Sequence, residues 1–148
     1  MKKIVSATLL FAALGTVAAL ADAHSDRQAV MRANGGAQRA LAPLVAAYDA
    51  AAVKVQGQIL VDNAAKIKTL YAAGTDMNDP QANPVIWTDM AGFSAANAKF
   101  ATDAAAVAAA ADGPSLQAAL TAVNADCGGC HRTYRVNPPR PPAPPAAQ

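Results

Sequence analysis

The sequence predicts an all-α protein, an antiparallel four-helix bundle, and three features carry this prediction. Hydrophobic residues make up 53% of the 148 residues but aromatic residues only 5%, because much of the apolar content is alanine, the strongest helix former. No run of alternating Val, Ile, Thr and aromatic residues between turn signals predicts a strand. Four segments instead place apolar residues at steps of three and four. Segments of about 20 to 25 residues with short connections favour an antiparallel bundle, and the length fits one domain.

Two helices are predicted in the first half of the chain. The first runs from Ser25 or Asp26 to about Tyr48, with a bend or frayed turn near Pro43, because an interior proline costs about 3 kcal/mol. The second spans residues 49–74, which begin with an aspartate suited to the N-cap and end with a glycine suited to a left-handed C-terminal position. Their apolar seams are Val30, Ala37, Leu41, Leu44 and Tyr48, and then Val53, Leu60, Ala64, Ile67 and Leu70 or Tyr71.

Two more helices are predicted after a loop over residues 75–83. Asn83 and Pro84 are typical of a cap followed by proline at the first helical position, and this third helix is expected to continue to Asp112 and Gly113. A fourth helix begins at Pro114. Their seams are Ile86, Met90, Phe93, Asn97, Phe100 and Val107, and then Leu116, Leu120, Val123, Cys127, Cys130 and Tyr134. Alanine at many facing positions leaves the core short of bulk, so a bound group is expected to fill part of it.

The two ends of the chain are expected to lie outside the bundle. Residues 1–23 have a basic start, an apolar stretch and small residues, the layout of a secretory signal peptide with cleavage after Ala21 or Ala23. An uncleaved membrane anchor is the alternative, because 17 apolar residues are near the lower limit for spanning a bilayer. After cleavage no stable membrane anchoring is expected. The domain then covers residues 24–136, and the proline-rich residues 137–148 form a disordered tail.

The charge pattern argues against nucleic acid as a partner. Of the 12 basic residues, Lys2 and Lys3 leave with the signal peptide. The 10 that remain balance the 10 acidic residues, or 9 if Asp22 is also removed, so the exported chain is nearly neutral. The arginines are scattered along the sequence, and no basic stripe follows a phosphate backbone.

The only two cysteines lie in the segment Cys127–His131, whose Cys-Gly-Gly-Cys-His pattern marks covalent attachment of one c-type haem. On a helical turn, Cys127 and Cys130 can each form a thioether with a haem vinyl group, while His131 turns its imidazole onto the iron. The two glycines between them let the porphyrin rim approach the backbone.

Other interpretations of these residues are less well supported. A zinc site normally needs four Cys or His ligands, and only two cysteines and two histidines, His24 and His131, are present. A thioredoxin-like pair would be expected near a βαβ pattern, and no strand precedes these cysteines. A structural disulfide suits an exported protein but does not explain the adjacent His131.

The chain resembles the class II cytochromes c, which include cytochrome c-prime and its low-spin relatives. The resemblance covers nearly all of the exported chain and depends on three segments. These are the attachment motif near the C-terminus followed by Arg132-Thr133-Tyr134-Arg135, the segment Arg27-Gln28-Ala29-Val30-Met31, and the segment Pro84-Val85-Ile86-Trp87. In class I cytochromes c the motif lies near the N-terminus instead. The proline-rich tail departs from the family pattern and inherits no role from it.

The resemblance places Met31 on the distal side of the iron, since it stands four residues after Arg27. In the low-spin branch this residue is a methionine that ligates the iron, and Met/His ligation raises the reduction potential. Alternatively, Met31 only packs over the ring, as methionine often does in a core, and the sixth position stays open to nitric oxide or carbon monoxide. Met77 and Met90 could also ligate by residue type, but neither matches the family position.

The resemblance implies that two arginines are candidate partners of the haem propionates. Arg27 and Arg135 stand one helical turn from Met31 and His131 respectively, and guanidinium pairs well with carboxylate. Trp87, Phe93, Phe100 and Tyr134 are expected to pack around the ring. His24 is expected to be an exposed terminal residue.

These observations predict a periplasmic monohaem cytochrome that passes single electrons between redox partner proteins. With both axial positions filled, no substrate reaches the iron, so the protein would be an electron carrier and not an enzyme. The resemblance also implies a homodimer that forms through the first two helices. The alanine-rich surfaces of these helices do not by themselves establish such a dimer. A bundle that binds no cofactor and acts as an interaction protein is the remaining alternative.

Overall fold

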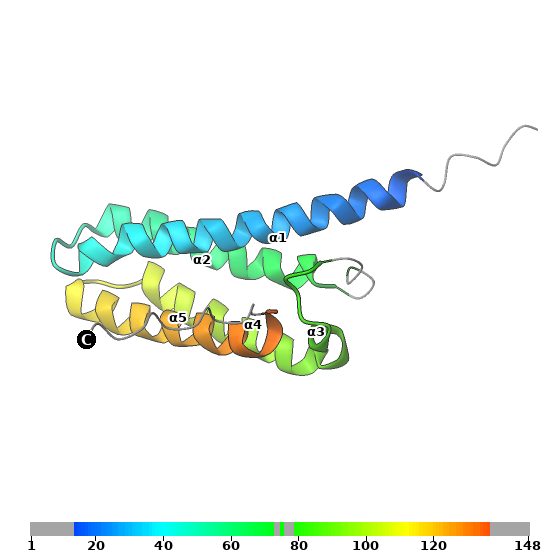
Figure 1. Cartoon of the computed structure of the whole chain (residues 1–148). Coiled ribbons are helices and arrows are strands. Elements are labelled where there is room, and N and C mark those ends of the chain that lie inside the picture. Colours follow the sequence, from blue (N-terminus) through cyan, green and yellow to red (C-terminus); the bar gives the residue numbers. More distant parts are fainter. Residues whose placement is uncertain (1–13, 73–74, 76–78, 137–148) are drawn as a thin grey trace, which may run out of the picture.

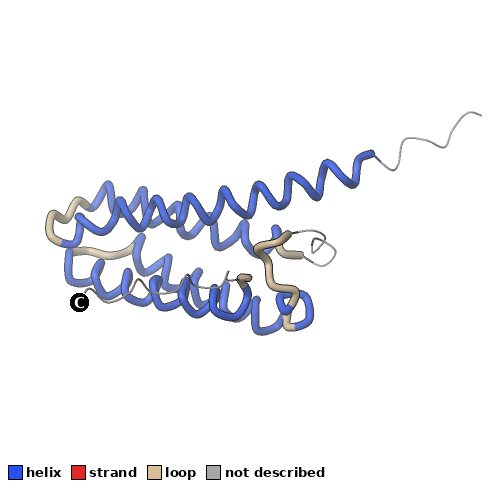
Figure 2. The backbone as a smooth tube through the Cα atoms, in the orientation of Figure 1, coloured by secondary structure: helices blue, strands red, loops and turns tan. Residues whose placement is uncertain are grey.

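The computed structural model describes residues 14–72, 75 and 79–136, and this part of the chain is helical with no strand. The helices are α1 (Leu14–Leu41), the 3₁₀ helix η1 (Ala42–Val45), α2 (Ala50–Leu70), α3 (Val85–Thr88), α4 (Met90–Ala108) and α5 (Gly113–Tyr134). Figures 1 and 2 show that the four long helices run alternately up and down, with α1 beside α2 and α4 beside α5. The predicted all-α, antiparallel four-helix bundle is therefore confirmed.

The first helix differs from its predicted bounds at both ends. It begins at Leu14, upstream of the predicted start, and ends at Leu41, before the predicted end at Tyr48. The chain continues as η1, which contains Pro43 near its start, because proline lacks the N–H that would continue an α-helix. The frayed turn expected near Pro43 is confirmed. The predicted signal peptide stays a prediction, and its residues 1–13 lie outside the described residues.

The second helix begins where the sequence predicts. Asp49 is its N-cap, and the carboxylate Oδ1 accepts a hydrogen bond from Ala52 N at 3.0 Å. The helix ends at Leu70, earlier than expected, and the predicted terminal glycine, Gly74, lies outside the described residues.

The third predicted helix is interrupted, which corrects the sequence prediction. Its first turn is α3, and Asp89 then starts α4 as a new N-cap, accepting a hydrogen bond from Gly92 N at 3.1 Å. A side-chain cap inside a helical pattern competes with continuation of the helix. The same carboxylate accepts a hydrogen bond from the hydroxyl of Tyr134 at 2.8 Å. Asp89 therefore also connects the start of α4 to the end of α5. Helix α4 ends at Ala108, four residues before the predicted end.

Helix α5 begins with a capping box. Asp112 accepts from Ser115 N at 2.8 Å while the Ser115 side chain faces back to the N-cap backbone N–H, which satisfies two of the orphan donors at the helix start. The helix then extends without interruption through the Cys-Gly-Gly-Cys-His segment to Tyr134. The motif therefore lies on a helix, as predicted.

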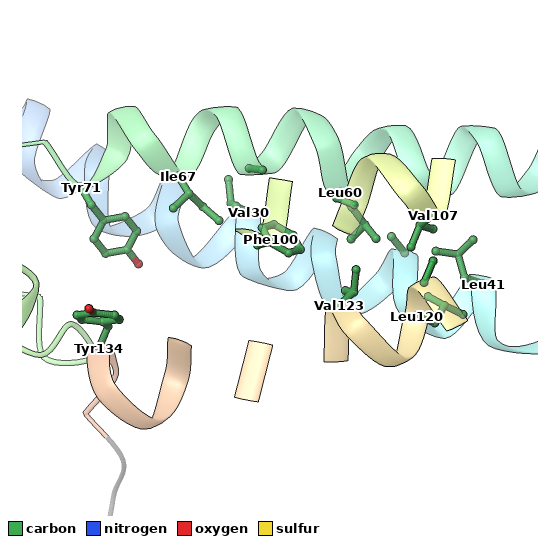
Figure 3. Packing of buried hydrophobic residues seen from close by; sticks show 14 of the residues in the cluster. Val30, Leu41, Leu60, Ile67, Tyr71, Phe100, Val107, Leu120, Val123 and Tyr134 are labelled. Atoms are coloured by element: carbon green, nitrogen blue, oxygen red, sulfur yellow. The ribbon is translucent and has the colours of Figure 1, made fainter. Parts of the chain in front are cut away.

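The apolar core lies between the four long helices. Its largest fully buried side chains are Leu41, Val53, Leu60, Ile86, Val107, Leu116 and Val123. In Figure 3, Leu41, Val107 and Leu120 gather at one end of the cluster and Tyr71 and Tyr134 at the other. Most predicted seam residues are buried, while Leu44, Tyr48, Leu70, Met90, Asn97, Cys127 and Cys130 are half-buried. The periodicity therefore identified the core faces correctly.

Three buried or partly buried polar contacts connect the helices, and the sequence did not predict them. Asn63 Nδ2 donates to Asn34 Oδ1 at 2.8 Å between α2 and α1, and Asn97 Nδ2 donates to the carbonyl of Ala64 at 3.0 Å between α4 and α2. The hydroxyl of Tyr48 donates to the carbonyl of Ala110 at 2.6 Å. Because burial makes an unpaired polar group costly, these pairs fix the register between the helices.

The segment before α3 is attached to the end of α5. Asn83 N donates to the carbonyl of Tyr134, and Val136 N donates to the carbonyl of Gln81, each at 3.0 Å. This bridge brings residues more than 50 positions apart together at the end of the bundle where the motif lies. No helix in the described part of the chain is both long enough and apolar enough to cross a bilayer.

Candidate haem site

A cavity of about 490 Å³ lies among the helices near the C-terminal end of α5. Its volume falls within the range of roughly 300 to 1,000 Å³ that is usual for cofactor and ligand pockets. Helix α1 contributes Arg27, Gln28, Met31, Arg32 and Asn34, helix α5 and its C-cap contribute Asp126, Cys127, Cys130, His131, Tyr134 and Arg135, and Ile67, Tyr71, Asp79, Gln81, Ile86, Phe93, Ala96, Asn97 and Phe100 complete the lining. The alanine-rich core was expected to leave space for a bound group, and this cavity is such a space.

The three reactive side chains of the motif all line this cavity from one face of α5. Cys127, Cys130 and His131 are each half-buried, as expected for positions three and four residues apart on a helix. A Cβ atom added at Gly128 would contact only the Arg132 guanidinium, at 3.4 Å, and one at Gly129 only the same group, at 3.8 Å. Apart from this guanidinium, no side chain lies within 4 Å of either added Cβ position, so no core packing covers the backbone between the cysteines.

The surroundings of the two cysteines favour neutral thiols. Burial raises the pKa of Cys127, although Gln38 Nε2 donates to its sulfur at 3.6 Å. Burial also raises the pKa of Cys130, and the neighbouring Cys127 adds to the effect. Redox-active cysteines instead have lowered pKa values in electropositive surroundings. The structure therefore does not support a thioredoxin-like role for the pair.

His131 is suited to binding a metal ion. Burial lowers the pKa of its imidazole, and the positive charge of Arg135 lowers it further. The neutral imidazole that results at pH 7 is the form that coordinates metals. Among the described residues no group of three or more His, Cys, Asp and Glu side chains could hold a metal ion by itself. A zinc-type site at this histidine is therefore not supported.

Met31 contributes to the same cavity from α1. It is half-buried and packs against the edge of the core. Of the other candidate methionines, Met90 packs against the core but does not line the cavity, and Met77 lies outside the described residues. Among the described methionines, only Met31 shares the cavity with His131.

Arg27 lines the cavity and is 3% exposed, and its guanidinium binds the segment that follows α2. Its Nε and Nη2 donate to the carbonyl of Leu70 at 2.9 and 2.8 Å, and Nη2 also donates to the carbonyl of Thr75 at 2.6 Å. Nη1 pairs with Asp79 Oδ2 at 3.0 Å, and the guanidinium lies 4.4 Å from the ring centroid of Tyr71. Arg27 therefore connects α1 to one wall of the cavity, a role that the sequence did not show.

Asp79 is the acidic centre of this contact. Burial acts to raise the pKa of its carboxyl, but hydrogen bonds from Gln81 N, Arg27 and His24 outweigh burial and hold the pKa below its usual range. His24 Nδ1 lies 3.0 Å from Asp79 Oδ1. The expectation that His24 is an exposed terminal residue was wrong, because its half-buried ring packs against this loop.

Arg135 is exposed and lines the cavity at the C-cap of α5. Phe93, Phe100 and Tyr134 line it as well, and Phe93 lies between two other rings, 5.1 Å from Tyr71 and 5.2 Å from Tyr134 by their centroids. Figure 3 shows Tyr71, at the C-cap of α2, and Tyr134, at the end of α5, on opposite sides of this end of the core.

Trp87 differs from the other predicted ring-packing residues. It is half-buried on α3, outside the lining, with its ring centroid 5.6 Å from the guanidinium of Arg27.

A second charged group beside the motif was not predicted. Lys99 Nζ contacts Asp126 Oδ1 and Asp103 Oδ2, each at 2.6 Å. Burial raises the pKa of Asp126, which lines the cavity next to Cys127. Lys99 and Asp126 belong to different helices and are 27 residues apart, so no local sequence signal connects them.

Comparison with known proteins places the chain in the cytochrome c′ family. The family model described as Cytochrome C′ matches residues 22–135. A protein named cytochrome c-556 from Agrobacterium fabrum (strain C58 / ATCC 33970) is 35% identical over 139 residues, which cover 89% of this chain and 94% of the relative. A cytochrome c-556 from Agrobacterium tumefaciens (strain II Chrys) is 35% identical over 113 residues, covering 73% and 92%. The chain is therefore a class II c-type cytochrome.

Solved structures agree with this assignment. Cytochrome c′ from Rhodopseudomonas palustris superposes with a TM-score of 0.69 at 30% identity, covering 78% of this chain and 97% of that chain. A nitric oxide complex of a mutant cytochrome c prime from Alcaligenes xylosoxidans superposes with a TM-score of 0.72 at 30% identity, covering 80% and 97%. The family carries covalently attached haem c, and this chain has its two cysteines, Cys127 and Cys130, near the C-terminus.

Proposed function

We propose that this cytochrome is a periplasmic carrier of single electrons, with His131 and Met31 as the axial ligands of one covalent haem c. One observation carries the proposal: Met31 from α1 and Cys127, Cys130 and His131 from α5 line one cavity. The helices that supply the two ligands are the first and the last of the bundle. Tertiary packing is therefore what brings a thioether and an imidazole to the same cavity.

Each residue of the motif has a distinct task in this proposal. Cys127 and Cys130 would attach the haem through thioether bonds, and the neutral imidazole of His131 would supply a nitrogen ligand to its iron. When bound, the haem supplies the one-electron couple between ferric and ferrous iron. The buried rings of Phe93 and Phe100 keep water away from the cavity wall, and a dry surrounding is one of the factors that set a reduction potential.

The thioether of Met31 is proposed to fill the distal position. Its polarizable sulfur makes it a soft ligand, and Met/His ligation raises the reduction potential. With Met31 and His131 both holding the iron, no position would remain for a substrate, and the haem would supply only one-electron chemistry. This is why we propose a carrier and not an enzyme.

Arg27 and Arg135 are proposed to contact the haem propionates. Both line the cavity, one from α1 and one from the end of α5. Arg135 is exposed at the C-cap of α5. Arg27 is held by Asp79, Leu70 and Thr75, so a contact with a propionate would come from the side of its guanidinium that faces the cavity.

The distal assignment is tested by absorption spectra of the oxidised and reduced protein with and without carbon monoxide. The wild-type spectrum should be low-spin and unchanged by carbon monoxide. Met31→Leu removes the sulfur at similar volume and should give a high-spin spectrum that shifts when carbon monoxide is added. Met90→Leu is the matched control, because Met90 packs on the core outside the cavity, and its spectrum should equal that of the wild type.

The main alternative is an open sixth position that binds nitric oxide or carbon monoxide. The similar cytochrome c prime from Alcaligenes xylosoxidans forms a nitric oxide complex in its mutant structure. In that case the wild-type spectrum would already be high-spin and would shift with carbon monoxide, and Met31→Leu would change little. A low-spin spectrum that survives Met31→Leu would instead show that another residue is the ligand.

Export and assembly are further parts of the proposal. Signal peptide cleavage after Ala21 or Ala23 would place the cytochrome domain, residues 24–136, in the periplasm together with the tail over residues 137–148, and mass spectrometry of periplasmic protein would show the cleaved chain with haem added. The redox partners are proteins, and a homodimer through α1 and α2 is proposed from the family resemblance. Val55 on α2 is 60% exposed. Val55→Glu should therefore reduce the molar mass measured by light scattering if this face is the interface.

A further inference from the structure

The two proposed cleavage sites of the signal peptide create different amino termini. Cleavage after Ala21 leaves a chain that begins Asp22-Ala23-His24, with a histidine at its third position. Cleavage after Ala23 leaves His24 itself at the first position. Both sites follow the small-residue pattern of a signal peptide, but the match to the family model begins at residue 22. Cleavage after Ala21 therefore agrees with the start of the family domain.

A chain that begins at Asp22 carries four nitrogen atoms in succession. They are the α-amino group of Asp22, the backbone amide nitrogens of Ala23 and His24, and the imidazole Nδ1 of His24. Only short stretches of covalent chain separate neighbouring nitrogens in this series, so all four can bind one metal ion through fused chelate rings. A planar set of nitrogen ligands is typical of Cu(II) and Ni(II). The histidine must be third, because each later position inserts another amide nitrogen before the ring.

Cleavage would also release the two amide nitrogens from the helix. α1 starts upstream of these residues and runs through them without a break, so helix geometry pairs the N–H groups of Ala23 and His24 with carbonyls four residues earlier. Those carbonyls belong to Ala19 and Leu20 and leave with the signal peptide. The first N–H groups of a helix have no partner within it. The step that creates the free amine therefore also makes both amides available.

His24 lies near the surface with its Nδ1 beside a carboxylate. Its side chain is 33% exposed, and Nδ1 lies 3.0 Å from Asp79 Oδ1. The other ring nitrogen, Nε2, lies 3.1 Å from Nε2 of Gln28, so Gln28 contacts the nitrogen that the metal does not need. Asp79 also accepts hydrogen bonds from Arg27 Nη1 and Gln81 N, each at 3.0 Å. His24 can therefore exchange its contact with Asp79 for a metal ion while Arg27 still holds Asp79 to α1.

His24 is the imidazole that the proposed haem site leaves available. The chain contains two histidines, and His131 is assigned to the haem iron. Among the described residues, no group of three or more His, Cys, Asp and Glu side chains could hold a metal ion. A site at the amino terminus needs no such group, because three of its ligands come from the backbone and the terminal amine.

We propose that cleavage after Ala21 creates a site for one Cu(II) or Ni(II) ion at the amino terminus. Its ligands are the amine of Asp22, the amide nitrogens of Ala23 and His24, and His24 Nδ1. The inference rests on the proposed export and goes beyond the electron-carrier function. The metal ion loses bound water and replaces both amide protons and any proton on the amine, and these protons pass to the buffer. Cu(II) should bind most tightly, whereas Zn(II) prefers tetrahedral sites and should bind far more weakly.

The test uses holoprotein that has been exported and processed in the periplasm. Intact mass identifies the first residue and the attached haem. Isothermal titration calorimetry at pH 7 then measures the binding of Cu(II), Ni(II) and Zn(II) in competition with glycine. Wild type should begin at Asp22, bind Cu(II) and Ni(II), and release at least two protons for each ion bound. The Cu(II) electron paramagnetic resonance signal should show splitting by four nitrogens.

The decisive variant carries an extra glycine between Ala21 and Asp22. The insertion moves His24 to the fourth position but keeps every side chain of the domain. Its affinity for Cu(II) should fall at least about 100-fold, since loss of an outer-shell partner alone costs about 10- to 100-fold. Asp22→Asn is the matched control, because it keeps all four nitrogens, and it should bind Cu(II) like the wild type. Intact mass confirms that both variants are cleaved after Ala21.

Three results would overturn the proposal. They are a processed chain that begins at a residue other than Asp22, an insertion variant that binds Cu(II) as tightly as wild type, and Zn(II) binding as tight as that of Cu(II). The last result would favour a site formed by the side chains of His24 and Asp79. The absorption spectrum and its response to carbon monoxide report on the haem iron and should be the same in wild type and both variants. A failure of this metal site is therefore distinguishable from a failure of the Met31 assignment.

Discussion

Substituting Gly57 by alanine tests how closely α2 and α4 approach each other. A Cβ atom at this position would lie 2.6 Å from Ala108 Cα and 2.7 Å from Ala108 N. These obstructing atoms belong to the backbone, so no side-chain rotation relieves the clash, and the two helices must move apart. Overpacking of this kind costs about 3 kcal/mol, the upper end of the usual range. The higher helix propensity of alanine offsets about 1 kcal/mol of this loss of stability.

The net expectation for Gly57→Ala is a loss of about 2 kcal/mol in the free energy of unfolding, or about 8 °C in Tm for a domain of this size. Gly36→Ala is the matched control on α1, where an added Cβ would meet no atom within 4 Å. It should gain about 0.5 to 1 kcal/mol. Urea denaturation of the holoproteins, followed by circular dichroism, measures both values. A Gly57→Ala protein as stable as Gly36→Ala would refute the close approach.

Two further predictions concern the buried polar contacts. Asn63→Ala leaves the side-chain oxygen of Asn34 buried without its donor, so it should cost about 1 to 3 kcal/mol, and a double-mutant cycle with Asn34→Ala should show coupling between the two sites. Independent, additive effects would contradict a direct contact. Asp79→Asn should lower stability at pH 7 by about 2 kcal/mol, because a charge-assisted contact with Arg27 is lost. Since the folded pKa of Asp79 is lowered, its contribution is complete above the unfolded pKa of about 3.9 and is lost as the pH falls through the folded value. The gap between wild type and Asp79→Asn in urea denaturation should therefore narrow between pH 5 and pH 3, and a constant gap would contradict this reasoning.

The helices with local start signals were predictable from the sequence. Asp49 and Asp112 each cap a helix through a contact with a backbone N–H three residues on, and such contacts depend only on neighbouring residues. The interruption at Asp89 was missed because the apolar spacing continues through it. Tyr134, 45 residues away, donates to the same carboxylate, and nothing near Asp89 in the sequence indicates that contact.

The candidate site also combines residues that the sequence identifies with contacts that only the fold reveals. Cys127, Cys130 and His131 were identified from five consecutive residues, and the cavity confirms that these three side chains face one space. The sequence indicated only part of the role of Arg27. Its distance of four residues from Met31 indicated a shared helix face, but its hydrogen bonds to Leu70, Thr75 and Asp79 connect residues 43 to 52 positions apart. The pairing of Lys99 with Asp126 is equally invisible in the sequence.

By itself, the sequence determined the helical class, the family and the residues that can attach and ligate a haem, because helix periodicity, caps and the attachment motif are properties of short segments. Only the tertiary structure decided which of these segments meet. Packing of α1 and α5 about one cavity brings Met31 to the motif. Met31 and His131, about 100 residues apart in sequence, line one cavity only after the bundle has closed, since the interactions between side chains depend on distance in space and not on separation along the chain.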